Sequence, residues 1–172
     1  MNEKLKAAVR DVPDFPIKGI LFKDITPILK DPALFRLAVD TLADRHQHKK
    51  LKAVVGIDAR GFIFAGAVAY KLGIGFIPVR KKGKLPWKTV GASYTLEYGR
   101  ETTEMHVDAL AKGDNVIIID DLLATGGTAM AAATLVTKLG GTIAEIDFLI
   151  ELAFLKGRDR LKDYPVFSAI TY

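Results

Sequence analysis

The sequence predicts an α/β fold in which a central, mostly parallel sheet is flanked by helices. Short runs of β-branched and other apolar residues alternate with helical segments through the middle of the chain. The runs are continuously apolar, which is typical of parallel strands that are buried on both faces. The chain has 172 residues, 49% of them hydrophobic, so we expect residues 1–172 to form a single domain with a buried core.

Each element of this fold has a local signal. The expected strands are the apolar runs Ala53–Ile57, Gly75–Val79, Val116–Ile119 and Ile143–Ile150. The expected helices are one that begins at Pro32 behind an Asp31 cap, one over Gly61–Leu72, and one over Gly127–Leu139 that ends at two glycines. In such a sheet ligands bind beyond the carboxyl ends of the strands, so functional residues should directly follow strands.

A long segment, Arg80–Asp114, interrupts the alternation of strands and helices. Within it, Ala92–Tyr98 and Glu101–Val107 predict a β-hairpin that turns around Gly99 and Arg100 and leaves the central sheet. A long insertion beside a binding face is often a lid, so we expect a flexible lid over about residues 81–107.

Composition excludes several classes of function. The chain has no cysteine, which rules out a disulfide framework, a zinc cluster built on thiolates and a thiolate nucleophile. The net charge of +5 predicts a polyanionic partner, either nucleic acid or a small phosphorylated molecule. The densest basic run, Arg80–Lys84, has no nucleic-acid-binding motif beside it, so we expect no nucleic-acid partner. His46, His48 and His106 lack metal-ligand spacing, and we expect them on the surface.

The sequence predicts neither a secretory signal peptide nor a membrane helix. The N-terminal residues lack the apolar core of a signal peptide, and no apolar stretch approaches the roughly 20 residues of a membrane helix. We therefore expect a cytoplasmic protein that does not bind membranes.

The segment Val116–Thr128, VIIIDDLLATGGT, carries the clearest chemical signal. Its small residues and glycines let backbone N–H groups close around a phosphate, and the following helix contributes positive potential. Two threonine hydroxyls add donors. We therefore expect a phosphate to bind at Ala124, Thr125, Gly126, Gly127 and Thr128.

Asp120 and Asp121 stand directly before this phosphate-binding loop. Two carboxylates would repel a bare phosphate, so they need sugar hydroxyls or a magnesium ion with its water shell to hold. A phosphosugar with Mg²⁺ supplies all of these groups. The chain has neither a GxxxxGK[ST] nor a GxGxxG motif, which disfavours nucleotide hydrolysis and dinucleotide binding.

The same segment resembles the thirteen-residue motif with which type I phosphoribosyltransferases bind phosphoribosyl pyrophosphate (PRPP), and its DDLLATGGT form resembles the adenine phosphoribosyltransferases of that family. Five further segments resemble the same family in the same order and cover nearly the whole chain: FPIKGILFKDITPILKDP, GIDARGFIFAGAVA, VRKKGKLPW, SYTLEYG and ELAFLKGRDRL. The resemblance implies the type I phosphoribosyltransferase fold, with a small N-terminal hood over about residues 12–30.

The resemblance implies a pyrophosphate site built from Arg60, Arg80, Lys84 and Tyr98. Arg60 follows the first strand, where a planar guanidinium suits pyrophosphate oxygens, although a salt bridge to Asp58 is the alternative. Arg80 and Lys84 follow the second strand and could act in the same subunit or in a neighbouring one.

The resemblance also assigns Glu97 as the general acid or base that handles the adenine proton. A closed lid would raise the pKa of this glutamate toward the working range. Without the motif, Glu97 would be interpreted as an exposed strand carboxylate. Glu101 and Glu104 have the same chemistry without the match.

The implied adenine pocket has apolar walls and a few hydrogen bonds. Phe22, Lys23 and the backbone around Leu21 resemble the hood of the family, and Leu152 resembles the opposite wall. Lys23 departs from the arginine that we expect there, which removes any stacking by a planar guanidinium. Core positions remain the alternative for Phe22 and Leu152.

The reaction that the resemblance implies is a step of purine salvage, in which PRPP and adenine give AMP and pyrophosphate. Mg²⁺ would bind through PRPP and water, without a direct protein ligand, and the enzyme would be a homodimer. Two alternatives stay open. One is a regulator that senses PRPP without catalysis, although the Glu97 motif would have no purpose in it. The other is the same transfer to guanine, hypoxanthine or orotate.

Overall fold

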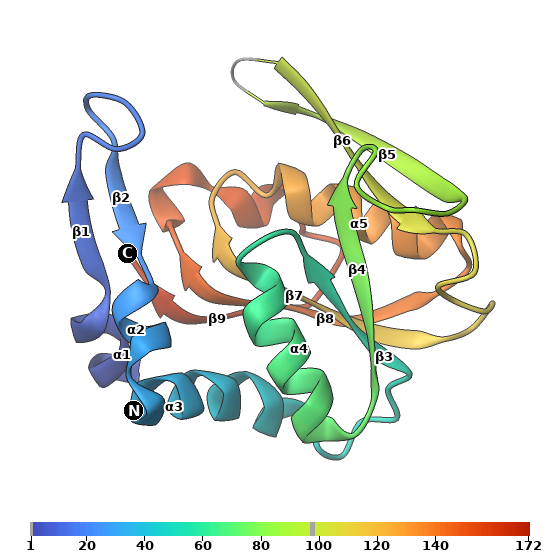
Figure 1. Cartoon of the computed structure of the whole chain (residues 1–172), viewed down its shortest axis with the longest axis horizontal. Coiled ribbons are helices and arrows are strands. Elements are labelled where there is room, and N and C mark those ends of the chain that lie inside the picture. The colour runs from blue at the N-terminus through green and yellow to red at the C-terminus, as the bar shows by residue number, and fades with distance from the viewer. Residues whose placement is uncertain (1, 97–98) are drawn as a thin grey trace.

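The computed structural model describes residues 2–96 and 99–172. Its main sheet has seven strands in the order β5-β6-β4-β3-β7-β8-β9 (Figure 1). The four predicted strands are confirmed as β3 (Ala53–Ile57), β4 (Gly75–Lys81), β7 (Asn115–Leu123) and β8 (Thr142–Glu151), and neighbouring strands among them are parallel. The mostly parallel α/β class is therefore confirmed.

Three strands, β4, β7 and β8, are longer than the apolar runs that predicted them. β7 continues through the acidic pair to Leu123, because Asp120 and Leu122 pair with Phe148 and Ile150 of β8. β4 likewise includes Arg80, which pairs with a residue of β6. Polar residues at the carboxyl end of a strand thus keep the ladder hydrogen bonds and place their side chains at the rim of the sheet.

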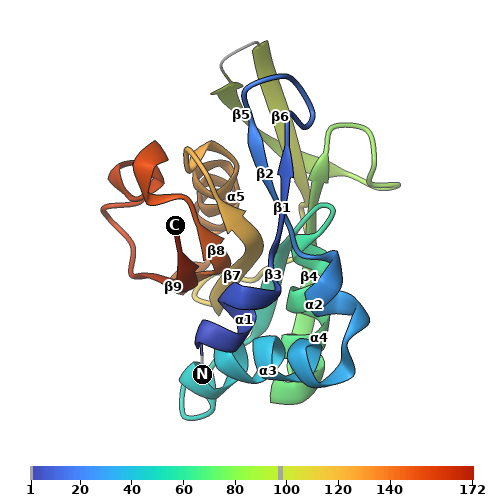
Figure 2. The same cartoon turned by 90° about the vertical axis from the view of Figure 1, so that its left-hand side faces the viewer.

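The helices cover both faces of the sheet. Helices α3 (Pro32–Ala43) and α4 (Gly61–Leu72) lie on one face and α5 (Gly127–Lys138) lies on the other (Figure 2). Asp31 caps α3 as predicted, because its carboxylate accepts hydrogen bonds from two backbone N–H groups of the first turn. Each face has its own buried cluster, with Ile118 under α5 and Ile117 under α4.

The predicted hairpin is formed by β5 (Thr89–Leu96) and β6 (Gly99–His106), but it does not leave the sheet. β6 pairs with β4, so the hairpin forms the edge of the sheet, and Ala92 and Met105 are buried in the core. The base of the hairpin therefore packs into the core, and the flexible lid over about residues 81–107 stays a prediction.

The register of the hairpin also corrects the predicted turn. Gly99 pairs with Leu96 and Arg100 pairs with Thr95, so both residues lie in the ladder of β6 rather than in the turn. A glycine next to a charged residue is an ordinary turn signal, and only the cross-strand pairing moves it into the strand.

The N-terminal segment forms a small separate sheet. Helix α1 (Asn2–Ala8) leads into the antiparallel pair β1 (Arg10–Pro13) and β2 (Leu21–Asp24), and α2 (Thr26–Lys30) follows. In Figure 1 this hairpin and the β5–β6 hairpin project on the same side of the main sheet, with the loop between β7 and α5 between them. The carboxyl ends of β3 and β7 point to that side.

The C-terminal segment closes the sheet on its other edge. Strand β9 (Val166–Thr171), which the apolar runs did not predict, is parallel to β8. Three short 3-10 turns, η1 (Asp44–His46), η2 (Ala153–Leu155) and η3 (Gly157–Arg160), connect the larger elements. Among the residues that the structure describes, no helix has both the length and the apolar character needed to span a membrane.

Candidate functional site

The predicted phosphate-binding loop connects β7 to α5 and encloses a small pocket. The pocket has a volume of about 150 Å³ and is lined by residues 122–129 together with Asp120 and Phe148. Gly126 has a φ of 78°, a left-handed conformation that side chains rarely adopt. Helix α5 begins at the next residue, so its first N–H groups face this loop as the sequence predicted.

The outer side of the loop packs directly on the turn η3. A Cβ atom on Gly157 would lie 2.3 Å from the carbonyl oxygen of Ala124, and one on Gly126 would lie 2.5 Å from the carbonyl oxygen of Gly157. Both glycines are needed for this contact between two backbones. Sequence reasoning missed Gly157, although this glycine lies in ELAFLKGRDRL, one of the segments that resemble the family.

The acidic pair lies at the entrance to the loop. Asp121 is 5% exposed, Asp120 is half-buried, and the backbone N–H of Asp121 donates to Oδ1 of Asp120 at 2.9 Å. Burial, and then the charge of Asp121, raises the pKa of Asp120 well above its ordinary value. Burial also raises the pKa of Asp121, although Arg60 opposes this shift. The pair therefore favours a cationic or hydrogen-bond-donating partner.

Arg60 pairs with Asp121 and not with Asp58. Nε of Arg60 lies 2.8 Å from Oδ2 of Asp121, whereas the carboxylate of Asp58 accepts a hydrogen bond from Arg80 at 3.0 Å. The loop after β3 can approach this closely because Gly61 lacks a side chain, since a Cβ atom there would lie 2.6 Å from Oδ1 of Asp120. The loops after β3 and β7 thus meet at one point.

Arg80 and Lys84 are brought together through the backbone. Besides its contact with Asp58, Arg80 donates from Nη1 to the carbonyl oxygen of Lys84 at 3.0 Å. The Lys84 side chain is exposed. Arg80 therefore links the end of β3 to the segment after β4, next to the Arg60 loop.

The N-terminal hood reaches this site through an aromatic pair. The rings of Phe15 and Phe22 meet edge to face with centroids 5.1 Å apart, and Cζ of Arg60 lies 5.0 Å from the centroid of Phe22. A pocket of about 240 Å³ lies here, lined by Val12, Phe15, Phe22 and Asp24. Arg60 thus contacts both the hood and the acidic pair.

The other predicted adenine residues have different surroundings. The Lys23 ammonium pairs with Asp11 at 2.6 Å and lies 3.9 Å from the ring centroid of Tyr172, so it holds the C-terminal end against the hood. Leu21 is half exposed. Leu152 is half-buried, and its N–H donates to the carbonyl oxygen of Leu123 at 2.9 Å, next to the phosphate loop.

Glu97 and Tyr98 lie outside the described residues. Within the described part of the hairpin, the Tyr94 hydroxyl donates to Glu101 at 2.9 Å, and Lys81 donates to the same carboxylate at 2.9 Å. The hydrogen bond from Lys81 lowers the pKa of Glu101, and burial raises the pKa of Tyr94. The Tyr94 ring also lies 3.2 Å from the position of a Cβ atom on Gly127. Sequence reasoning missed this contact of the hairpin with the phosphate loop.

The surface position expected for His46 is wrong. Its side chain is 1% exposed, and Nε2 lies 2.5 Å from Oδ2 of the equally buried Asp147. Glu145 is close by, but its carboxylate already accepts from Arg45 and Lys49. With the imidazole at hydrogen-bond distance from an aspartate and the glutamate neutralised by two cations, this cluster is a buried ion-pair network between η1 and β8. The other two histidines are exposed (His48) and half-buried (His106).

Comparisons with known proteins agree with this geometry. The family model described as "Phosphoribosyl transferase domain" matches residues 24–170. The chain is 55% identical to the adenine phosphoribosyltransferase of Roseiflexus sp. (strain RS-1) over 172 residues, 100% of both chains. The adenine phosphoribosyltransferase structure from Thermoanaerobacter pseudethanolicus has a TM-score of 0.97 and 49% identity, with 100% of both chains covered. The one from Saccharomyces cerevisiae, complexed with adenine and an imino-altritol bisphosphate, has a TM-score of 0.93 and 44% identity, covering 98% of this chain and 97% of that one.

The similarity extends over the hood, the sheet and the phosphate loop alike, because the matches span the full length of the chain. The predicted resemblance and the type I phosphoribosyltransferase fold are both confirmed. The chain belongs to the phosphoribosyltransferase family and, within it, to the adenine phosphoribosyltransferases.

Proposed function

We propose that the chain is a cytoplasmic enzyme of purine salvage that transfers the 5-phosphoribosyl group of PRPP to adenine and releases AMP and pyrophosphate. The observation that carries this proposal is the position of Arg60, which contacts Phe22 of the hood and Asp121 of the PRPP motif at once. A base in the hood and a ribose at the acidic pair would then lie on either side of one guanidinium. The adenine bound to the Saccharomyces relative supports the choice of base.

The phosphate-binding loop holds the 5-phosphate in this proposal. Backbone N–H groups at Ala124, Thr125, Gly126, Gly127 and Thr128 and the start of α5 supply donors and positive potential. The 5-phosphate is remote from the reacting anomeric carbon. Its binding energy therefore positions the ribose for displacement rather than taking part in it.

Asp120 and Asp121 hold the ribose hydroxyls or the water shell of Mg²⁺. The residues fit this role. Burial raises the pKa of both neighbouring aspartates because their carboxylates have lost water, so a cation or a hydrogen-bond donor stabilises the ionised pair. Mg²⁺ that arrives with PRPP would neutralise the pyrophosphate and polarise it as a leaving group. We propose that the ion binds through PRPP and water rather than in a closed protein site.

Arg60, Arg80, Lys84 and Tyr98 bind the pyrophosphate. Arg60 and Arg80 are each paired with one aspartate in the free protein, Arg60 with Asp121 of β7 and Arg80 with Asp58 after β3. Two pyrophosphate oxygens can accept a pair of hydrogen bonds from one guanidinium, as the two oxygens of a carboxylate do. When pyrophosphate replaces an aspartate as the partner of Arg60 or Arg80, the guanidinium therefore still has an anion beside it.

The adenine lies between the hood and the end of β8, against Phe22, the backbone of Leu21 and Lys23, and Leu152. Because the Lys23 ammonium is engaged by Asp11 and Tyr172, only its backbone is available to the base. Glu97 handles the adenine proton as general acid or base.

The test is a direct assay of nucleotide formation with Mg²⁺, PRPP and each of adenine, guanine, hypoxanthine and orotate. We expect AMP from adenine and at least a hundredfold lower turnover with the other bases. Binding of PRPP without any nucleotide product would support the sensing regulator instead. A preference for another base would keep the transfer and refute the choice of adenine.

Replacing the acidic pair should weaken PRPP binding. With Asp120→Asn and Asp121→Asn combined, we expect the Kd for Mg·PRPP to rise about tenfold or more, because amides bind the hydroxyls and the magnesium waters less strongly. Isothermal titration calorimetry gives the value. Asp163→Asn, at an exposed position, is the matched control and should leave the Kd unchanged.

The same pair predicts a pH dependence of that Kd. Both aspartates have a raised pKa in the free protein and must be ionised when the ligand is bound, so binding should weaken as the pH falls through those raised values. In the double variant this part of the pH dependence should vanish. An unchanged profile would remove the pair from the ligand site.

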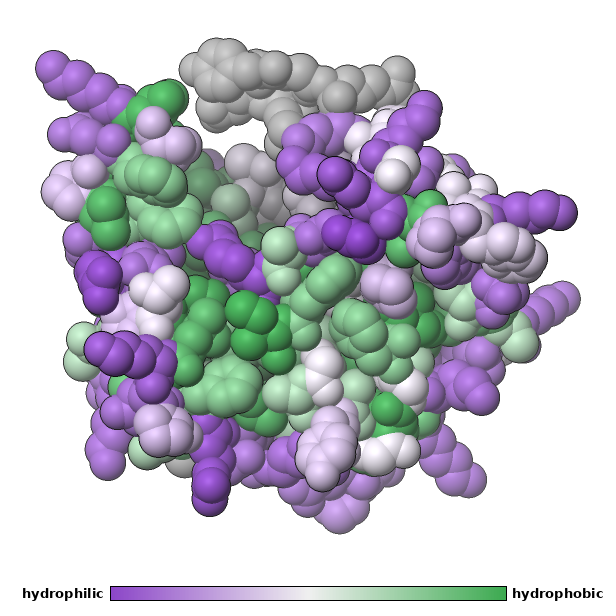
Figure 3. Space-filling view, in the orientation of Figure 1, coloured by the Kyte–Doolittle hydropathy of each residue, from purple (hydrophilic) through white to green (hydrophobic). Residues whose placement is uncertain are grey.

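An apolar face over α4 and β4 supports the homodimer. Ile63 and Tyr70 of α4 are 40% and 91% exposed, Phe76 of β4 is 40% exposed, and the rings of Phe62 and Phe76 meet edge to face. Figure 3 shows this face as a continuous apolar area in the middle of the view, with mostly polar residues around it. We propose that a second copy of the chain covers it, which places the two Arg80 segments near the interface.

Light scattering should accordingly give a mass of twice the 18.8 kDa of one chain. Ile63→Glu should shift the mass to that of a monomer, because it places a charge in the middle of the covered face. Val107→Glu, which changes an exposed residue directly after β6, is the control and should remain dimeric. A wild-type monomer at micromolar concentration would refute the dimer.

A further inference from the structure

We propose that Arg160 is a further residue of the phosphate site, which binds the 5-phosphate of PRPP and of AMP through its charge. This role rests on the proposed function, because it assumes that the loop between β7 and α5 holds that phosphate. Neither the PRPP motif nor the residues assigned from it include Arg160, which lies more than thirty residues further along the chain.

The guanidinium of Arg160 lies beside the start of α5. Its Nη1 is 3.7 Å from the position that a Cβ atom on Gly127 would take, and its Cβ is 3.4 Å from the corresponding position on Gly126. These two glycines are the last residue of the loop before the helix and the first residue of the helix. The positive charge therefore lies beside the first residue of α5, at the end of the phosphate-binding loop.

The backbone of Arg160 is held firmly in this position. Turn η3 packs on the loop through the contact of Gly157 with the carbonyl oxygen of Ala124. Directly after Arg160, Leu161 is fully buried in the core cluster under α5, and its N–H donates to the carbonyl oxygen of Arg158. Because the backbone is anchored on both sides of Arg160, only its exposed side chain has to be ordered when it binds an anion.

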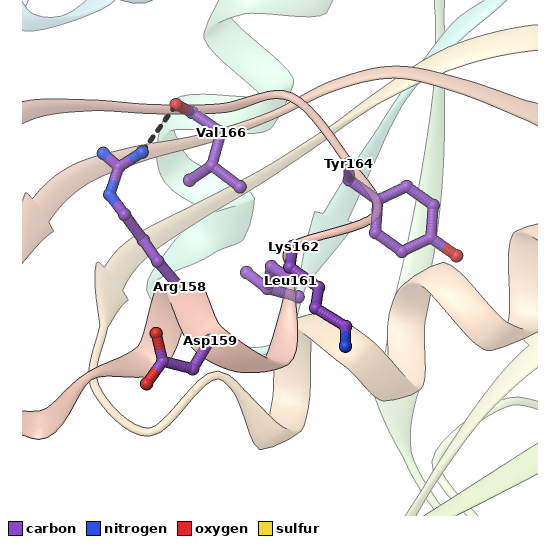
Figure 4. Close-up of a pocket in the computed structure, with 6 residues that line it drawn as sticks. All are labelled: Arg158, Asp159, Leu161, Lys162, Tyr164 and Val166. Carbon is purple, nitrogen blue, oxygen red and sulfur yellow. Dashed lines mark hydrogen bonds between the residues drawn. The ribbon is translucent and has the colours of Figure 1, made fainter.

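The charge of Arg160 has no counter-ion in the part of the chain that the structure describes. Arg158, two residues earlier, differs from Arg160 because its charge is paired. It donates to both carboxylate oxygens of Glu151 at 2.7 Å. It also donates to the carbonyl oxygen of Val166 at 2.9 Å, the bond drawn in Figure 4. Arg158 thus connects η3 to β8 and β9 through hydrogen bonds. Arg160 instead carries a charge that an anion in the phosphate-binding loop would neutralise.

A charge at this distance acts equally on substrate and product, because the 5-phosphate does not change during the reaction. Loss of such uniform binding raises KM and leaves kcat nearly unchanged. The effect adds to the potential of the α5 N-terminus, which acts on the same phosphate. Arg160 is therefore a binding residue and takes no part in proton transfer.

The decisive variants are Arg160→Gln, Arg160→Lys and Lys162→Gln. For Arg160→Gln we expect the KM for PRPP and the Kd for AMP to rise about tenfold, with kcat within twofold of the wild type and the Kd for adenine unchanged. Arg160→Lys should stay within about threefold, because the charge remains. Lys162 lines the hollow in Figure 4 with Arg158, Asp159, Leu161, Tyr164 and Val166, and its replacement removes the same net charge without an effect on KM.

Ionic strength separates a charge effect from a loss of structure. The Kd for AMP of the wild type should rise with salt more steeply than that of Arg160→Gln, because the variant lacks the screened contact. Equal slopes, or the same KM in Arg160→Gln and Lys162→Gln, would overturn the role of Arg160. Failure of the proposed function is a different result, since the wild type would then form no AMP from adenine and PRPP at all.

Discussion

Glu97→Gln should lower kcat for AMP formation about a hundredfold or more, while the Kd for Mg·PRPP stays within about twofold of the wild type. The glutamine keeps the size and the hydrogen-bonding oxygen of the glutamate, but it cannot accept or release a proton near the working pH. In the proposed function Glu97 is not among the residues that bind PRPP, so we expect PRPP binding not to depend on this carboxylate. Single-turnover kinetics and calorimetry give the two quantities.

Glu104→Gln is the matched control, and the structure explains why it should have little effect. Glu104 lies on β6, and its carboxylate accepts a hydrogen bond from the backbone N–H of Gly83 at 3.0 Å. An amide oxygen accepts the same bond, so kcat should stay within about twofold. Glu101 is unsuitable as a control, because it binds both Lys81 and Tyr94. Equal losses of kcat in Glu97→Gln and Glu104→Gln would remove Glu97 from its role.

The parts of the fold that could be predicted from the sequence are those with a local cause. The strand Ala53–Ile57 and the helix Gly61–Leu72 have the predicted bounds, because a fully buried strand is continuously apolar and the glycine after Leu72 adopts a left-handed conformation that ends the helix. The phosphate-binding loop was predicted for the same reason, since its small residues and the following helix are contiguous in the chain. Strand β9 could not be predicted in this way, because its serine interrupts a short apolar run.

Contacts between distant segments account for what could not be predicted. His46 is buried because Asp147, 101 residues away in the chain, lies on the strand beneath it. Arg60 had a carboxylate two residues before it, yet it pairs with Asp121, because the tight packing of Gly61 brings the loop after β3 against the end of β7. Spacing along the chain gives no information about either choice.

Gly157→Ala should distort the phosphate-binding loop, because Gly157 of η3 packs against the outer side of that loop. The new methyl group would lie 2.3 Å from the carbonyl oxygen of Ala124 and 2.8 Å from the side chain of Leu123, and neither a backbone oxygen nor a buried leucine can move without shifting the loop. Overpacking of this kind costs about 1–3 kcal/mol. If the strain falls on the ligand site, the KM for PRPP should rise by up to about a hundredfold, since each 1.4 kcal/mol corresponds to a factor of ten.

The effect of this strain on Tm and on ligand binding depends on whether it is present in the free protein or only in the ligand complex. Strain in the free protein lowers Tm by about 2–4 °C for each kcal/mol, whereas strain that appears only when the loop closes on a phosphate raises the KM for PRPP and the Kd for AMP and leaves Tm unchanged. Gly75→Ala is the control, because a Cβ atom there meets only ordinary contacts at 3.6 Å. Calorimetry and kinetics on both variants therefore separate the two cases. A Gly157→Ala variant with the Tm and KM of the wild type would refute the role of η3 as support of the loop.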